Sequence, residues 1–226
     1  MRRPRPAFFI RGNHGMTISM DEVSVAFLFY AWNIWNTPNV NQKCTMEYVD
    51  YQSVIDKYYP EDNALRRLFL RHSRDVADRA LAICDRHPEL SLDRRFVEEG
   101  AMLHDLGIFR TDAPGIHCCG TDPYILHGYD GGLLLRAEGL PRHARVCERH
   151  TGAGITLRQI EEQHLPLPHQ DFLPETLEEQ VICYADKFYS KSHPERVKTI
   201  EEAERSVAKH GADGLERFRE WERMFE

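Results

Sequence analysis

A histidine and an aspartate stand side by side at the end of an apolar run, in the segment EEGAMLHDLGIF at residues 98–109. Burying an imidazole next to a carboxylate costs free energy unless a partner satisfies both groups. A helix that only packs in a core has no need of such a pair. His104 and Asp105 are therefore candidates for chemistry rather than for packing.

Further side chains of metal-ligand type stand on the apolar faces or at the ends of the expected helices: His72, His127, His150 and Asp186. Taken singly, an inward histidine is more often a hydrogen-bonded core residue than a ligand. Asp186 is harder to dismiss, because an isolated buried carboxylate requires a cation or strong donors. Taken together, the groups would need several separate partners, whereas one or two divalent cations would satisfy all of them.

The helices that position these groups follow from the spacing of apolar residues. Between residues 65 and 83 such residues recur every three or four positions, which predicts one face of a helix with His72 on it. Ser91 or Asp93 can cap a second helix, which ends before Gly107. A third is expected over about 124–138, and Pro141 opens a fourth that ends near residues 150–154.

The rest of the chain continues this helical pattern. Thr156 with Gln159, and Thr176 with Glu179, have the spacing of capping boxes, and helices are also expected around residues 200–207 and 215–225. Residues 111–123 are rich in Gly and Pro and predict a loop. We find no convincing alternating strand and no internal repeat, so we predict an all-α domain with a single core.

Composition describes a soluble globular protein, with 42% hydrophobic and 29% charged residues. Residues 1–45 carry five Lys or Arg against two acidic residues, a charge of +3, so the formal charge of −7 leaves −10 for the remainder. An acidic body argues against binding of long nucleic acid, which requires Lys and Arg on the phosphates. The spacing of the six cysteines favours free thiols in a reducing compartment, so we expect a cytoplasmic protein.

The N-terminal segment needs separate treatment because it differs in charge and lacks the helical period. Its apolar run, VSVAFLFYAW at residues 23–32, is too short to span a bilayer. We interpret residues 1–45 as an extension outside the fold and residues 46–226 as the domain. Translation from an upstream start codon, with Met46 the native start, is the favoured origin of the extension, and a secretion signal is the alternative.

The order His72, His104-Asp105, Asp186 resembles the H…HD…D signature of the HD-domain metal-dependent phosphohydrolases, and AMLHDLG is similar to their typical sequence around the pair. The resemblance covers roughly residues 50–190 and is greatest to small HDIG-type proteins, in which ERHTGAG and PETLEEQVICYADK are typical. It implies a single all-helical HD-domain bundle in which these four residues bind a metal ion.

Two-metal branches of that family place two more histidines between the HD pair and the last aspartate, and His127 and His150 match those positions. The resemblance then implies that Asp105 bridges two metal ions, with His127 and His150 on the second. These branches include cyclic-dinucleotide phosphodiesterases and HD-type diadenosine tetraphosphate hydrolases. The segment GYD at residues 128–130 is not the GYP motif of the former, which weighs against cyclic-di-GMP as substrate.

Such a ligand set suits iron, manganese, zinc, cobalt or nickel. We expect a hydroxide on one or two of these ions to attack phosphorus, with His104 and Asp105 as the central catalytic pair. Lys187, Arg74 and Arg149 neighbour ligands in the sequence and are candidates for binding phosphate, although each fits a solvated surface charge as well. Four further histidines are expected at the surface: His87, His164, His169 and His193. His117 and His143 could reach a substrate, but a place at the surface or in a loop is favoured.

The leading hypothesis is a metal-dependent phosphohydrolase acting on a nucleotide or related small phosphoester. The alternatives are a non-catalytic sensor that binds metal and nucleotide, and a helical module with incidental histidines. A small phosphorylated molecule is the expected partner, with no membrane and no long nucleic acid; a homodimer is compatible with the sequence. Nothing in the sequence names the substrate.

Overall fold

The computed structural model describes residues 8–11, 17–20 and 49–226. The chain divides into two compact units, Met1–Tyr48 and Val49–Glu226, which are treated separately. In the first unit, strands β1 (Phe8–Arg11) and β2 (Thr17–Met20) pair antiparallel, with Phe8 opposite Met20. The other residues of the expected extension, including the apolar run at residues 23–32, lie outside the described residues. The two strands were not predicted from the sequence.

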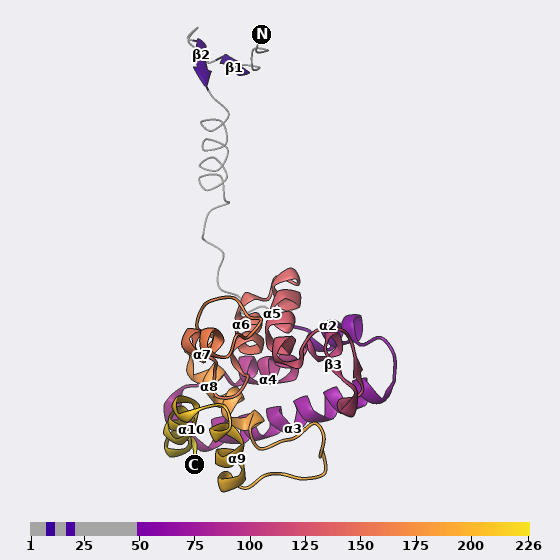
Figure 1. Cartoon of the computed structure of the whole chain (residues 1–226), viewed down its shortest axis with the longest axis vertical. Coiled ribbons are helices and arrows are strands. Elements are labelled where there is room, and N and C mark those ends of the chain that lie inside the picture. Colours follow the sequence, from indigo (N-terminus) through magenta and orange to yellow (C-terminus); the bar gives the residue numbers. More distant parts are fainter. Residues whose placement is uncertain (1–7, 12–16, 21–48) are drawn as a thin grey trace. The chain divides into compact units, whose positions relative to one another are not determined.

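The second unit is built of helices (Figure 1), which confirms the all-α class. Its helices are α2 (Tyr51–Tyr58), α3 (Ala64–Arg86), α4 (Arg94–Leu103), α5 (His127–Ala137), α6 (Pro141–Arg149), α7 (Leu157–Glu162), α8 (Leu177–Asp186), α9 (Ile200–Ala208) and α10 (Ala212–Phe225). The long helix α3 packs against α4 and α8, α5 packs against α6, and α10 packs against α9 and α8. This arrangement brings together the ends of several helices.

A small two-stranded sheet interrupts the helices between α4 and α5. Strands β3 (Asp112–Ala113) and β4 (Cys118–Cys119) pair antiparallel within the segment that the sequence predicts as a loop. The expectation of no strand was therefore wrong here as well. Strands of two residues are too short to give the alternating pattern by which a strand is recognised.

Side-chain caps explain where the helices begin. Asp93, rather than Ser91, caps α4 by accepting a hydrogen bond from the Phe96 amide at 3.1 Å. The capping boxes predicted at Thr156 and Thr176 are both present, and Thr199 forms a third at the start of α9. Each such cap stabilises its helix by about 1 kcal/mol, so these helix starts are encoded locally.

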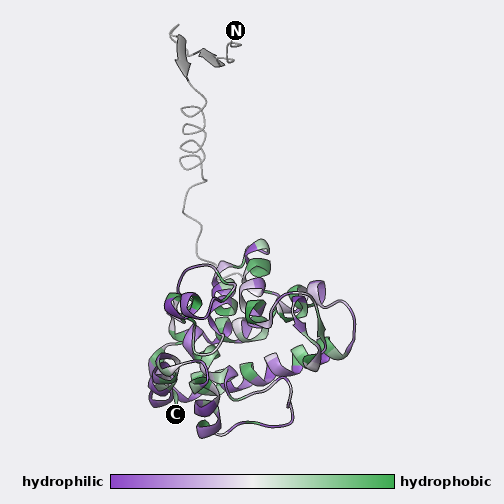
Figure 2. Ribbon diagram, in the orientation of Figure 1, coloured by the Kyte–Doolittle hydropathy of each residue, from purple (hydrophilic) through white to green (hydrophobic). Residues whose placement is uncertain are grey.

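The core lies among α3, α4, α6, α8 and α10. Helices carry both hydrophilic and hydrophobic residues (Figure 2), as expected for amphipathic elements that bury one face. The apolar residues predicted for the first long helix, such as Phe69, Val76 and Ile83, are fully buried. At Gly100 a β-carbon would lie 2.8 Å from Ile182 Cδ1, so this glycine allows α4 and α8 to pack closely.

Five cysteines fall within the described residues, and all five are free thiols. Burial raises the pKa of Cys84 and of Cys118 to about 11, so both are protonated near neutrality. Among the described residues, no helix has both the length and the apolar character needed to cross a bilayer.

Candidate metal centre

Six side chains from five helices converge at the helix ends on one side of α3. His72 lies within α3; His104 and Asp105 follow the last turn of α4; the remaining three are the first residue of α5, the residue after α6 and the last residue of α8, namely His127, His150 and Asp186. All six are at most 8% exposed. The structure thus brings together every residue that the sequence analysis proposed as a metal ligand.

Asp105 lies at the centre of this group and is fully buried. Its Oδ2 atom lies 3.1 Å from His72 Nε2 and 3.2 Å from His104 Nε2. Its Oδ1 atom lies 3.5 Å from His127 Nε2 and 3.4 Å from His150 Nε2. The two carboxylate oxygens therefore face two different pairs of histidines.

Asp186 lies on the same side of the group as the first histidine pair. Its Oδ1 atom is 3.1 Å from His72 Nε2 and 3.7 Å from His104 Nε2. The donor atoms of His72, His104 and Asp186 all lie within 4.8 Å of one another, as do those of His104, Asp105 and His150. Each of these trios has the spacing of ligands around one cation.

Backbone carbonyls fix the orientation of three imidazoles. The Nδ1 atoms of His104, His127 and His150 lie 2.6, 2.6 and 2.7 Å from the carbonyl oxygens of Ala101, Tyr124 and Cys147. A carbonyl oxygen can only accept, so each Nδ1 carries the proton and donates it. In the neutral ring, each Nε2 then presents its lone pair to the site, as a metal-binding histidine does.

The electrostatic environment of the second histidine pair, His127 and His150, favours a bound cation. Burial and the neighbouring His150 lower the pKa of His127 to about 3, and burial lowers the pKa of His150. Neither ring is protonated near neutrality, yet their Nε2 atoms lie 3.0 Å apart. Two lone pairs facing each other at this distance repel, and a metal ion bound by both would remove the repulsion.

The electrostatic environment of the first histidine pair, His72 and His104, differs from that of the second. Although burial opposes it, Asp105 and Asp186 raise the pKa of His104 to about 9. The same carboxylates have pKa values well below their usual range, because burial is outweighed by the nearby lysines and histidines. Two ionised carboxylates with so little exposure are costly without cations, so this half of the site also favours positive charge.

Unsatisfied polar atoms give a direct test of whether a metal fits. His72 Nε2, His104 Nε2 and Asp105 Oδ1 are buried without a hydrogen bond, and Asp105 Oδ2 also has none of acceptable geometry, although the Lys191 ammonium lies 2.6 Å from it. Such atoms are rare in native interiors and need an explanation. Imidazole nitrogens and carboxylate oxygens together are donors that divalent transition metals accept. The residues therefore fit a metal centre, and they could hold one ion or two.

A comparison with known families bears on this arrangement. The family model described as HD domain matches residues 69–190, more than half of the chain and the whole span from His72 to Asp186. The chain belongs to the HD domain family. The family assignment expected from the H…HD…D order is confirmed.

Three curated relatives each match about half of this chain. A tRNA (cytidine(56)-2'-O)-methyltransferase of Picrophilus torridus is 37% identical over 54% of this chain and 32% of its own length. A protein of the same name from Thermoplasma volcanium is 34% identical over 54% of this chain and 31% of its own. An uncharacterized protein of Methanocaldococcus jannaschii is 36% identical over 50% of this chain and 66% of its own. The matches thus span about a third of each methyltransferase. No solved structure matches the chain.

Two lysines reach the carboxylates of the HD domain site. Lys187 Nζ lies 2.6 Å from Asp186 Oδ2 and donates to the His150 carbonyl at 2.8 Å. Lys191 Nζ lies 2.6 Å from Asp105 Oδ2. Lys187 was proposed from its place beside Asp186, whereas Lys191 was missed. It follows α8 in a segment with no periodicity, so nothing in the sequence marks it.

The structure does not bring Arg74 and Arg149 to this site. Arg74 pairs with Glu98 at 2.9 Å and with Asp78 at 2.8 Å. Arg149 pairs with Glu175 at 2.5 Å and donates to the Leu173 carbonyl at 2.7 Å. Successive residues of a helix point in directions about 100° apart, so nearness to a ligand in sequence does not carry a side chain to the same pocket.

His143 also differs from expectation. It was placed at the surface or within reach of a substrate, but it is buried in α6. Its Nε2 atom lies 3.1 Å from Glu99 Oε2, and its ring packs edge-on against Phe96. It is a satisfied core histidine. His117 lies on an exposed turn with φ of 64°, as a surface residue.

Gly107 allows the first turn of α5 to approach the HD pair. A β-carbon at this position would lie 2.3 Å from the His127 carbonyl oxygen and 2.4 Å from the Gly131 amide nitrogen. Real side chains do not approach backbone atoms so closely. The glycine of the HDLG segment thus permits the contact that carries His127 to Asp105.

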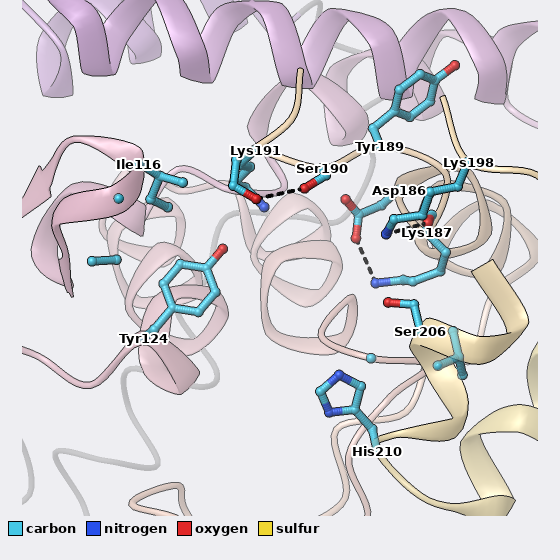
Figure 3. A pocket seen from close by; sticks show the side chains of 15 residues that line it. Ile116, Tyr124, Asp186, Lys187, Tyr189, Ser190, Lys191, Lys198, Ser206 and His210 are labelled. Atoms are coloured by element: carbon cyan, nitrogen blue, oxygen red, sulfur yellow. Dashed lines mark hydrogen bonds and ion pairs between the residues drawn. The ribbon is translucent and has the colours of Figure 1, made fainter. Parts of the chain in front are cut away.

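A cavity of about 480 Å³ opens beside the metal ligands (Figure 3). Asp186, Lys187 and Lys191 form its floor, and Ile116 and Tyr124 line one side. Ile116 belongs to the segment at residues 111–123 that the sequence predicts as a loop. The Tyr124 ring also stacks on His127, with 4.6 Å between centroids. The volume falls within the range of small-molecule binding sites.

Proposed function

We propose that this HD domain is a metal-dependent phosphohydrolase acting on a nucleotide or related small phosphoester. The observation that carries the proposal is that the metal-ligand side chains lie next to cationic side chains in a cavity. Unsatisfied histidine and carboxylate atoms suited to metal lie directly beside a cavity whose floor holds two partly buried lysines. A site that only had to bind metal would not need cations next to its ligands.

One or two divalent transition-metal ions held by the six ligands would act as a Lewis acid on a phosphoryl oxygen and would activate water. The chain's own residues have complementary roles. Lys187 and Lys191, whose side chains are 11% and 12% exposed, are positioned to bind the non-bridging oxygens of a phosphate at the cavity floor, where charge interactions are stronger than in bulk water. Asp105, enclosed between both histidine pairs, is positioned to orient a water molecule toward that phosphate.

The test is a screen of nucleotides and generic phosphoesters with the full chain loaded in turn with manganese, iron, cobalt, nickel or zinc. We expect hydrolysis in at least one metal form, and loss of orders of magnitude in turnover for Asp105→Ala. Asp130→Asn is the matched control, because Asp130 is a buried carboxylate of α5 outside the ligand group. Tight metal and nucleotide binding without turnover would instead favour a sensor.

The relatives favour a second candidate substrate. Two of them are named as tRNA methyltransferases, and the match covers only about a third of their length. We do not extend methyl transfer to this chain, because about two thirds of each methyltransferase lies outside the match. A segment shared with RNA-modifying proteins supports a phosphoester of an RNA terminus as the alternative to a free nucleotide. Comparing phosphate release from mononucleotides and from end-phosphorylated tRNA would separate the two.

We also propose that the protein works in the reducing environment of the cytoplasm. The free state of the five described cysteines supports this. Thiol titration of the protein isolated without reductant, before and after unfolding, would test it. A disulfide in the native protein would contradict the proposal.

A further inference from the structure

The cavity beside the metal ligands has two unlike sides. Figure 3 shows Ile116 and Tyr124 on one side and Lys198, Ser206 and His210 on the other, with Asp186 and Lys191 between them. One side is apolar and aromatic, whereas the other carries a cation, a hydroxyl and an imidazole. A single phosphate at the floor, between Lys187 and Lys191, would leave the polar side without a ligand.

The polar side comes from a part of the chain outside the HD family match, which ends at residue 190. Lys198 immediately precedes the capping residue of α9, Ser206 lies in α9, and His210 follows it. The Lys198 amide donates to the Phe188 carbonyl at 2.9 Å, next to the bridge between Tyr189 and Val197. These backbone contacts hold the polar side against the end of α8.

Lys198 differs from the other two lysines of the cavity in its partners. Lys187 pairs with Asp186 and Lys191 pairs with Asp105. The Lys198 ammonium donates to the Lys187 carbonyl at 3.1 Å, and within residues 49–226 it forms no ion pair with a carboxylate. A half-buried ammonium with one neutral partner retains unused donors, and Lys198 lines the cavity.

The net charge of the groups around the cavity also favours a ligand with more than one anionic group. The three lysines and the two carboxylates of Asp105 and Asp186 together give a charge of +1, and one divalent ion on the ligands would make it +3. A phosphate monoester brings a charge of about −2 at most, so positive charge would remain after one phosphate is bound. A second anionic group on the same ligand would neutralise it.

Further basic residues lie beyond Lys198. A neighbouring hollow of about 270 Å³ shares Lys198 and Ser206 with the cavity and is also lined by Arg196, Glu202, Arg205 and Lys209. Arg196 pairs with Glu202, whereas within the described part of the chain Arg205 and Lys209 form no ion pair with a carboxylate. Arg205 and Lys209 therefore add positive charge near Lys198, although Glu201 and Glu202 of α9 offset part of it.

We propose that Lys198, Ser206 and His210 form a second anion subsite, which binds a phosphate of the substrate other than the one that is cleaved. The substrate class would then be a phosphoester with at least two phosphoryl groups. This inference rests on the proposed phosphohydrolase function, because it treats the bound phosphoester as a substrate. The subsite itself is a binding property. Its specificity would come from the segment after the HD domain match.

The test is to measure dissociation constants by isothermal titration calorimetry. The metal-loaded full chain is titrated with α,ω-alkanediol bisphosphates of increasing length and with the matching alkyl monophosphates. A charge-assisted contact is worth about 1.5–3 kcal/mol, so the best-fitting bisphosphate should bind about ten- to a hundredfold more tightly than its monophosphate. Lys198→Met should abolish this gain, so that the bisphosphate binds about as tightly as its monophosphate. Lys57→Met removes an exposed lysine that pairs with Glu138, and should keep the gain.

Equal affinities of bisphosphates and monophosphates would overturn the proposal, and so would a gain that survives in Lys198→Met. If Lys198→Met does not fold, the same measurement on His210→Gln decides, because His210 is exposed and we expect a partial loss of the gain there. The two proposals fail separately. Hydrolysis without a bisphosphate gain removes only the subsite, and a bisphosphate gain without hydrolysis removes only the enzymatic function.

Discussion

The Nε2 atoms of His127 and His150 lie 3.0 Å apart, while the Nδ1 atom of each ring donates to a backbone carbonyl. This arrangement leaves two lone pairs facing each other beside Asp105 Oδ1. Protonation of a ring does not relieve the repulsion between these lone pairs near neutrality, because the pKa values of both rings are lowered. A second metal ion, in addition to one on the His72 side, is the simplest cation for this position.

We therefore expect His150→Ala to lower the metal content from about two ions per chain to about one, as measured by elemental analysis. Turnover of any substrate should fall by orders of magnitude. His143→Gln is the matched control, since His143 lies on the same helix but faces Glu99. Equal metal content in the wild type and His150→Ala would show that the site is mononuclear.

Gly107→Ala should affect both stability and the second metal position. Its β-carbon would meet backbone atoms of α5 at 2.3–2.4 Å, so the helix must move away from the HD pair. Overpacking of this kind costs about 1–3 kcal/mol of unfolding free energy. Urea unfolding and metal analysis should show both losses. Gly115→Ala, where a β-carbon meets no atom within 4 Å, should show neither.

His143 should contribute to acid sensitivity. Burial lowers its pKa despite the opposing effect of Glu99, with Arg142 and Asp93 also nearby. In the unfolded chain this histidine becomes protonated as the pH falls through about 6.5, whereas in the folded chain its protonation requires a lower pH. The free energy of unfolding should thus fall as pH drops below about 6.5, by at most about 1.4 kcal/mol per pH unit from this residue.

The measurement is urea unfolding of the wild type and His143→Gln at about pH 7.5 and about pH 5.5, on either side of the ordinary histidine pKa. Glutamine can donate to Glu99 without titrating, so the variant should lose less stability on acidification. An equal loss in both proteins would mean that other groups account for the acid sensitivity.

A chain that starts at Met46 should keep its helical content and its metal content. The reason is that residues 49–226 form a compact unit that includes all six ligands. Circular dichroism and elemental analysis of the shortened and full-length chains would check this. If the shortened chain unfolded or lost metal, residues 1–45 would be part of the domain.

Short-range information in the sequence was enough for much of the helical framework. The apolar period placed α3, and side-chain oxygens at Asp93, Thr156 and Thr176 marked helix starts, because both signals act within a few residues. The two short strand pairs escaped the same reasoning. A ladder of two to four residues depends on its partner strand more than on its own pattern.

The identity of the ligand-type residues was likewise available from the sequence, since imidazole and carboxylate groups on apolar faces are costly without a partner. Only the tertiary structure decided which cations join them. Lys191 and Lys198 reach the cavity, whereas Arg74 and Arg149 pair elsewhere and His143 is enclosed in the core. These outcomes depend on the direction of each side chain and on partners distant in the chain, and no local pattern encodes either.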